Sequence, residues 1–152
     1  MYGDNMPKEI SLKLTVNSVI DNLDNSGLPD GDPEINIFTT DGVLTMSEGG
    51  QRISFLESSD AGEISTALYV RGGKVTLKKR GAIESDMTFI EGEETSTLYS
   101  VGPYSFDMAI ITKRIRNTLS EEGGELALLY AMDVGGQKKN VRMKITLSKG
   151  KR

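Results

Sequence analysis

The chain repeats one pattern from end to end, in which apolar and polar residues alternate. In residues 9–17, EISLKLTVN, the apolar side chains fall on one face and the polar ones on the other. A period of two is typical of a β-strand with one buried face. The same period returns around Ile53, Leu68, Val75, Met87, Met108 and Ile145, and no segment has the period of an amphipathic helix. The sequence therefore predicts an all-β protein.

Glycine pairs separate these segments, at Gly49-Gly50, Gly72-Gly73, Gly123-Gly124 and Gly135-Gly136. Adjacent glycines adopt positive φ without steric cost, as two-residue hairpin turns require. We therefore expect a hairpin at each pair, and a meander of about eight or more strands that closes into a barrel and so removes its exposed edges. Residues 125–132, ELALLYAM, are predicted to form a strand buried on both faces. Residues 21–33 are predicted to form a flexible surface loop.

The length of 152 residues suits one domain. We expect a flexible N-terminal segment (1–8), a barrel domain (9–148) and a C-terminal tail (149–152). The start of the chain lacks the pattern of a secretory signal, and no apolar run is long enough for a membrane-spanning helix. These features predict a cytoplasmic protein with no membrane partner.

Composition removes several kinds of chemistry. The chain has no cysteine and no histidine, which excludes disulfides, thiol nucleophiles, Cys/His metal sites and histidine-based triads. Neither Gly-rich nucleotide loop is present. The acidic stretch DGDPE, residues 30–34, offers oxygen ligands, but Ile35 occupies the place where a calcium loop needs glycine. We therefore predict no enzyme activity, no catalytic residue, no metal site and no cofactor.

Four longer segments resemble the YwiB-like family, a bacterial domain of unknown function. They are KVTLKKRG, MTFIEGE, LYSVGPYSFDMAIIT and GGELALLYAMDVGGQ, within residues 74–137. Tyr99, Pro103, Tyr104 and Thr112 fit the family pattern, whereas Ser105 stands where glycine is usual. The resemblance implies a single antiparallel up-and-down β-barrel of the calycin (lipocalin-like) type. It implies no particular activity.

A small barrel is either filled by side chains or leaves room for one ligand. Alternation predicts that its interior is lined by Phe55, Leu68, Val75, Leu77, Met87, Phe89, Tyr99, Tyr104, Met108, Tyr130 and Met143. Arg52, Arg71 and Arg80, with the two tyrosines Tyr99 and Tyr104, are polar groups that would orient a ligand. The leading hypothesis is a non-enzymatic protein that binds a small, partly apolar molecule inside the barrel. Seven methionines suit a deformable pocket and an ordinary core equally well.

The uneven charge supports an alternative. Residues 1–66 contain 3 basic and 12 acidic side chains, whereas residues 68–152 contain 15 and 10. In YVRGGKVTLKKRG, residues 69–81, alternation turns the cations away from Val75 and Leu77. We predict one basic face made of Lys74, Lys78, Arg80, Arg142 and Lys144, to which TKRIR adds Lys113, Arg114 and Arg116. Such a face would bind RNA or an acidic protein, although no aromatic residues alternate with these cations. A third hypothesis is a purely structural partner or an oligomer built by edge pairing, and we expect a monomer or a small homo-oligomer.

Overall fold

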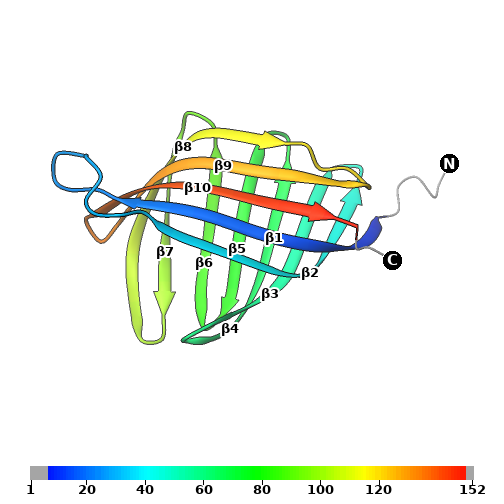
Figure 1. The fold of residues 1–152 in the computed structure, drawn as a ribbon, viewed down its shortest axis with the longest axis horizontal. Helices are drawn as coiled ribbons and strands as arrows, with labels where there is room; N and C mark the ends of the chain where they lie inside the picture. Colours follow the sequence, from blue (N-terminus) through cyan, green and yellow to red (C-terminus); the bar gives the residue numbers. More distant parts are fainter. Residues whose placement is uncertain (1–6, 150–152) are drawn as a thin grey trace.

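The structure is a computed structural model and describes residues 7–149. That range forms ten strands and no helix, arranged as Figure 1 shows. The strands are β1 (Lys8–Asn22), β2 (Glu34–Ser47), β3 (Gly50–Ser59), β4 (Gly62–Arg71), β5 (Lys74–Gly81), β6 (Ile83–Ile90), β7 (Glu94–Val101), β8 (Tyr104–Asn117), β9 (Gly123–Val134) and β10 (Gln137–Ser148). The described residues contain no helix that is long and apolar enough to cross a membrane.

Each strand pairs antiparallel with the strand that follows it, and β1 pairs with β10 to close the ring. The prediction of a single antiparallel up-and-down barrel is confirmed, with ten strands. An even number is needed because the first and last strands of such a meander can meet antiparallel only when the count is even. Lys8, which we expected in the N-terminal segment, is the first residue of β1. Residues 1–6 and 150–152 of the expected termini lie outside the described residues.

The predicted alternation decides which side chains fill the barrel. On β1, Leu12 and Leu14 are buried while Ser11 and Lys13 are exposed. The buried apolar side chains of all strands form one cluster, because inward residues of a small closed barrel meet across its axis. Residues 125–132 follow the same rule: their inner side chains are buried and their outer ones half-buried. The prediction of burial on both faces is wrong, because the outer face of the barrel meets solvent.

The glycine pairs have two different roles. Gly72-Gly73 and Gly135-Gly136 occupy two-residue turns with positive φ, as predicted. In contrast, the turn between β8 and β9 is formed by Glu121 and Glu122, and Gly123-Gly124 begin β9. Their φ angles are 117° and 123°. A Cβ on Gly124 would lie 2.2 Å from the Thr118 carbonyl oxygen, so this pair permits a close approach of two backbone segments.

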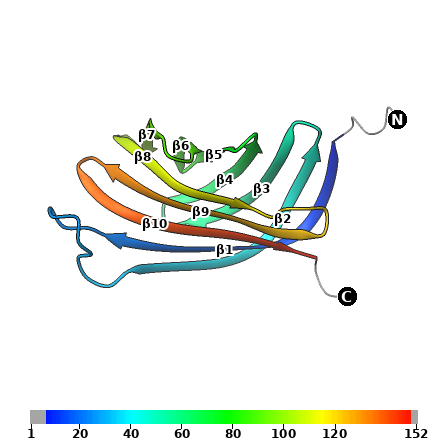
Figure 2. The ribbon, with the colours of Figure 1, turned by 90° about the horizontal axis from the view of Figure 1, so that it is seen from above.

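The connection between β1 and β2 is more ordered than the prediction of a flexible loop. Asp21 and Asn22 still belong to β1, and Leu23 forms a bridge with Pro29. Asp24 Oδ1 accepts hydrogen bonds from the backbone N–H groups of Ser26 and Leu28 at 2.9 and 3.0 Å, and another from the Ser26 hydroxyl. These bonds, that of the hydroxyl first, lower the pKa of Asp24. The loop extends beyond the barrel, in blue in Figures 1 and 2.

Pairing is incomplete at two places in the wall. β2 pairs with β3 only over Gly42–Ser47, so the first half of β2 pairs with β1 alone. β6 pairs with β7 only over Ile83–Ser85. Figure 2 shows β1 and β2 running together toward the loop, away from β3. The gap between β2 and β3 lies at the loop end of the barrel, and the gap between β6 and β7 lies at the end near the chain termini.

Candidate functional site

The two halves of the barrel interior differ. The half near the chain termini is filled by fully buried side chains, among them Leu14, Leu44 and Phe89, and Leu119 from the β8–β9 connection packs onto this cluster. The half near the β1–β2 loop contains a cavity of about 600 Å³. Its lining comes from seven strands and one turn: Ser18, Ile20, Leu77, Lys79, Met87, Tyr99, Phe106, Met108, Tyr130, Met132, Val134, Gly135, Gln137, Lys139, Val141 and Met143. This cavity is the candidate site.

Polar side chains form a belt along one wall beside the cavity. Strand register places Thr66, Lys79, Ser85 and Tyr99 in one row across β4, β5, β6 and β7. All four side chains face inward. Thr66, Lys79 and Ser85 each lie two residues from a buried apolar residue of the same strand, and Tyr99 pairs with Ser85. Ser85 Oγ is buried without a hydrogen-bond partner among residues 7–149. A belt of this kind gives an otherwise apolar interior a polar side.

Glu57 completes the belt from β3. Its Oε2 lies 3.1 Å from Lys79 Nζ and also accepts a hydrogen bond from the Thr66 hydroxyl. Only 16% of the Glu57 side chain and 21% of the Lys79 side chain is exposed. Burial, and to a smaller extent the Glu57 carboxylate, raise the pKa of Tyr99. The cavity wall therefore carries a paired carboxylate and ammonium group beside a neutral phenol.

Tyr130, on β9, lines the cavity and packs against Phe89 of the core. Their ring centroids are 4.8 Å apart and their planes are tilted by 60°, a favourable aromatic arrangement. Tyr130 is 3% exposed, and burial raises the pKa of its phenol. The side chain stays neutral at physiological pH and offers an apolar ring to the cavity.

The residues predicted to line the interior fall into three groups. Leu77, Met87, Tyr99, Met108, Tyr130 and Met143 line the cavity, and Phe55, Leu68, Val75 and Phe89 belong to the packed core. Tyr104 does not face the interior: it is 67% exposed. It is the first residue of β8, directly after the Gly102-Pro103 turn, where the barrel wall ends. Arg52, Arg71 and Arg80, expected to orient a ligand, lie on the outer face.

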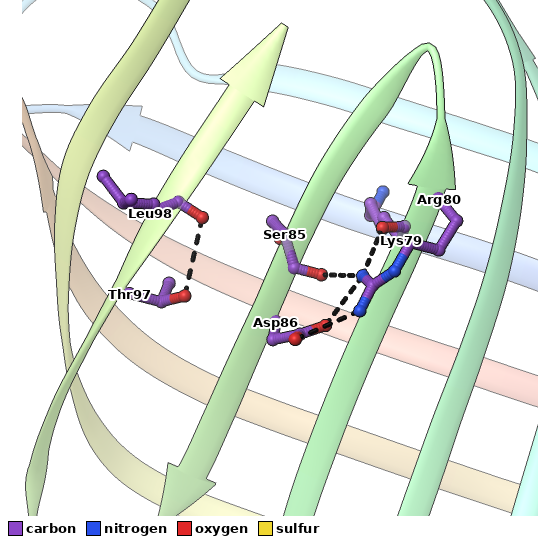
Figure 3. A network of polar contacts seen from close by, with 6 residues as sticks. All are labelled: Lys79, Arg80, Ser85, Asp86, Thr97 and Leu98. Carbon is purple, nitrogen blue, oxygen red and sulfur yellow. Dashed lines mark hydrogen bonds and ion pairs between the residues drawn. The ribbon is translucent and has the colours of Figure 1, made fainter.

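Arg80 is engaged within the barrel wall, as Figure 3 shows. Its guanidinium donates to both Asp86 carboxylate oxygens, at 2.8 and 3.1 Å, and to the Lys79 carbonyl oxygen at 2.7 Å. The hydrogen bond from Arg80 lowers the pKa of Asp86, and the same bond raises the pKa of Arg80. Arg80 therefore joins β5 to β6 and is not a free cation of a binding face.

The single basic face predicted from the sequence does not exist. In the ring, β5 is separated from β10 by four strands in either direction, so their outer faces point to opposite sides. Lys74 and Lys78 lie on one side, and Arg142 and Lys144 on the other, next to Arg114 and Arg116. The prediction is wrong because alternation shows which face of its own strand a residue occupies, whereas a shared surface also needs neighbouring strands.

The side that carries Lys74 and Lys78 also carries an aromatic residue. Register aligns Thr45, Arg52, Tyr69, Thr76 and Thr88 in one outward row across β2 to β6. Lys78 Nζ lies 5.7 Å from the centroid of the Tyr69 ring, and the row crosses a hollow of about 820 Å³. We call this surface the Tyr69 face. Sequence reasoning missed Tyr69, although the hairpin at Gly72-Gly73 turns it to the same side as Lys74.

Sequence reasoning also missed the polar residues of the cavity. Glu57 continues the inward series of Ile53 and Phe55, and Lys79 continues that of Val75 and Leu77, so alternation alone could have found both. Lys139 and Ser18 follow the same rule on β10 and β1. For the acidic loop, residues 7–149 contain no group of three carboxylates placed to hold a metal ion.

Comparison with known proteins identifies relatives over nearly the whole chain. The uncharacterized β-barrel protein YwiB of Bacillus subtilis (strain 168) is 29% identical over 146 residues, which are 95% of this chain and 98% of that protein. The crystal structure of ywiB protein from Bacillus subtilis matches with a TM-score of 0.84 at 28% identity, over 99% of this chain and 100% of that one. The model of a domain of unknown function, DUF1934, matches residues 24–147. The chain therefore belongs to the DUF1934 family of β-barrel domains.

Proposed function

We propose that this protein binds a small, partly apolar molecule in the cavity of its barrel, without transforming it. The observation that carries the proposal is the cavity itself. Its volume of about 600 Å³ falls within the range of small-molecule sites, and its apolar lining is interrupted by a few polar groups. A barrel interior that served stability alone would be filled with side chains, as the half near the termini is.

The polar groups indicate the chemistry of the ligand. Lys79 is neutralised by Glu57, but Lys139, which is half-buried in the lining, forms no ion pair with any residue from 7 to 149. An acidic group on the ligand would therefore be attracted to Lys139, while its apolar part lies against Leu77, Met108 and Tyr130. A carboxylate or sulfonate attached to an apolar body has this character.

Two measurements test the proposal. Native mass spectrometry of protein purified gently from cells should show a discrete adduct of small mass that is lost on denaturation. Anilinonaphthalene sulfonate, an apolar anion, should bind the emptied barrel and gain fluorescence, and the binding should persist at high salt because most of it is apolar.

A matched pair of variants locates the site. Ser18 lines the cavity, whereas Ser11 lies on the same strand and is exposed on the outer face. Ser18→Phe should reduce binding of the probe, because the ring occupies cavity volume, and Ser11→Phe should leave it unchanged. Equal binding by both variants, or no binding by the wild-type protein, would refute the proposal.

The Tyr69 face supports a second candidate function, the binding of single-stranded RNA. A row with an aromatic ring among hydroxyl and cationic groups resembles the stacking surfaces that bind such strands. The same native spectrum tests this candidate, since a bound oligonucleotide has a much larger mass. Its signal should disappear with Lys78→Glu and weaken steeply with salt.

A further inference from the structure

A β-bulge on β8 decides where two arginines point. The register between β8 and β9 shifts between Thr112 and Arg114, so Lys113 is the extra residue. Before the bulge, Ile110 and Thr112 are buried and face inward. After it, Ile115 packs against the core and Arg114 and Arg116 are exposed. Without the extra residue, the alternation of β8 would turn both arginines into the barrel.

The two arginines form one wall of a channel on the outer face. Register aligns Arg116, Ala127, Lys144 and Asn17 in one row, and Arg114, Leu129, Arg142 and Val19 in the next. The channel has a volume of about 430 Å³ and follows β9. Ala127 and Leu129 form its floor, the two arginines of β8 one wall, and Arg142 and Lys144 of β10 the other. We call this surface the arginine channel.

Three of the four cations of the arginine channel have no acidic partner among residues 7–149. Among residues 7–149, Arg114, Arg116 and Arg142 form no ion pair and no side-chain hydrogen bond, and Lys144 Nζ is 3.9 Å from Glu125. By contrast, Arg80 bonds Asp86 and Arg71 bonds the Gly49 carbonyl oxygen. The four cations around one apolar floor outnumber the carboxylates of Glu125 and Glu91 beside them, the latter bonded to the Ile115 N–H. The channel therefore has a net positive potential that an anionic partner would neutralise.

We propose that the arginine channel is the docking site for an extended acidic segment of a partner protein. Neighbouring cations on one wall are two strand residues apart, or about 6.8 Å, and the walls are two strand spacings apart, or about 9.6 Å. In an extended peptide, residues i and i+2 are separated by the same 6.8 Å and successive side chains point to opposite sides. Successive Asp or Glu residues therefore reach both walls in turn, while the peptide backbone lies over Ala127.

The same geometry favours a peptide over a nucleic acid in this channel. A single nucleic-acid strand has its phosphates along one side and its bases along the other, so one wall of cations would have no phosphate partner. Bases also need aromatic platforms, and the lining of the channel contains no aromatic side chain. The Tyr69 face, which does contain one, lies on the opposite side of the barrel.

Fluorescence anisotropy with the full-length protein tests the proposal. The probes are labelled hexaglutamate, labelled hexaglutamine and labelled hexauridylate, each measured at low and moderate salt. Hexaglutamate should bind in a salt-dependent manner and hexaglutamine should not bind. Any binding of hexauridylate should depend on Lys74 and Lys78 of the Tyr69 face, not on the arginine channel. Arg114→Glu combined with Arg142→Glu, one change on each wall, should weaken hexaglutamate binding by about tenfold or more.

Two further variants separate this site from general charge. Lys74→Glu combined with Lys78→Glu makes the same change of charge on the opposite side of the barrel and should leave hexaglutamate binding within about twofold of wild type. Ala127→Phe fills the floor without changing charge and should weaken binding. Thermal unfolding verifies that each variant is folded. Equal loss of hexaglutamate binding in the two double variants, or no binding of hexaglutamate at low salt, would overturn the proposal. So would tighter binding of hexauridylate that is lost with Arg114→Glu and Arg142→Glu but kept with Lys74→Glu and Lys78→Glu.

Discussion

Glu57 and Lys79 place two opposite charges on the inner face of the barrel. Removing a charge from water costs several kcal/mol, and the pair recovers that cost only through close contact and further hydrogen bonds. The contact of 3.1 Å and the hydrogen bond from Thr66 supply both. A pair of this kind adds little net stability, but loss of either partner leaves the other charge buried and uncompensated.

Removing only the lysine exposes that dependence. We expect Lys79→Met to destabilise the protein by about 3 kcal/mol, because it leaves the Glu57 carboxylate in the wall without its counter-ion. Glu57→Leu combined with Lys79→Met should recover most of that loss. Urea unfolding followed by circular dichroism measures both values. The interpretation fails if the double variant is no more stable than Lys79→Met.

Alternation predicted the inward direction of residues such as Met87 and Tyr130, because the period of two leaves each strand residue only two directions. The same rule points Lys79 inward, but a lysine is expected on the outer face. The pattern of a single strand does not show the cavity and the Glu57 partner that accept this side chain. Tyr104 was placed wrongly for a different reason. At the end of a strand the wall no longer continues, so the first residue after a turn is not held to the inward direction of Phe106 and Met108.

At the scale of strands and turns, Gly123 and Gly124 hold β9 against the segment before it. Gly124 has a φ of 123° and lies too close to the Thr118 carbonyl oxygen for any Cβ. The approach allows Thr118 N–H to donate to the Glu125 carbonyl oxygen at 2.8 Å. These contacts position Leu119, which packs onto the end of the core.

Gly124→Ala should therefore be costly, by about 3 kcal/mol, because both the backbone conformation and the contact are incompatible with a methyl group. Gly72→Ala is the matched control. Gly72 also has a positive φ, 55°, but a Cβ there meets no atom within 4 Å, so we expect about 1 kcal/mol. Thermal or urea unfolding of both variants gives the comparison. Equal losses of stability in the two variants would show that the backbone conformation alone, without the contact to Thr118, accounts for the cost.

Elements were predictable to the extent that they depend on local pattern. Period and glycine pairs predicted the hairpins at Gly72-Gly73 and Gly135-Gly136. The bulge at Lys113 was not predictable, because an inserted residue changes only the phase of alternation and Ile115 is the one apolar residue of TKRIR. The order in the β1–β2 loop depends on the Asp24 side chain bonding its neighbours, a pattern that composition alone does not distinguish from a mobile loop.

At the scale of the whole molecule, ring closure controls which surfaces exist. Closure separates the Tyr69 face from the arginine channel, although the same alternation predicted the cations of both. The expected up-and-down order could have shown this, since strands five positions apart in a ring of ten are opposite. This conclusion needs the number of strands, which the sequence does not specify fully. The turns at Asp60-Ala61 and Gly102-Pro103 carry no glycine pair, so the pattern of glycine pairs does not mark them.

The titration of the molecule is simple because it lacks histidine and cysteine. We expect the free energy of unfolding to change little between about pH 5 and pH 9. Above that range, Tyr130 loses its proton readily when unfolded but not when folded, since burial raises its folded pKa. The neutral Tyr130 phenol therefore contributes fully to the free energy of unfolding below about pH 10. That contribution falls as the pH rises further, by about 2 kcal/mol at pH 11.5.

Denaturant unfolding of wild type and Tyr130→Phe at pH 8 and pH 11.5 measures this contribution. The variant lacks the ionisable group, so its stability should fall less across that interval, although its value at pH 8 need not equal that of wild type. Parallel losses in the two proteins would show that Tyr130 is not the group responsible.

The pairing of β1 with β10 also affects how the chain reaches its structure. Lys13 is aligned with Ser148, so the first strand made by the ribosome has its final neighbour only when the last has been made. Until then β1 has one open edge and the interior is accessible to water. Contacts of such long sequence separation slow folding, so the finished barrel should form late and in a single cooperative step. The paired ends of β1 and β10 are adjacent, so they could be joined by a short linker and the chain opened at Gly72-Gly73. In that circular permutant β5 would be the first strand and β4 the last, and their pairing would become the late step.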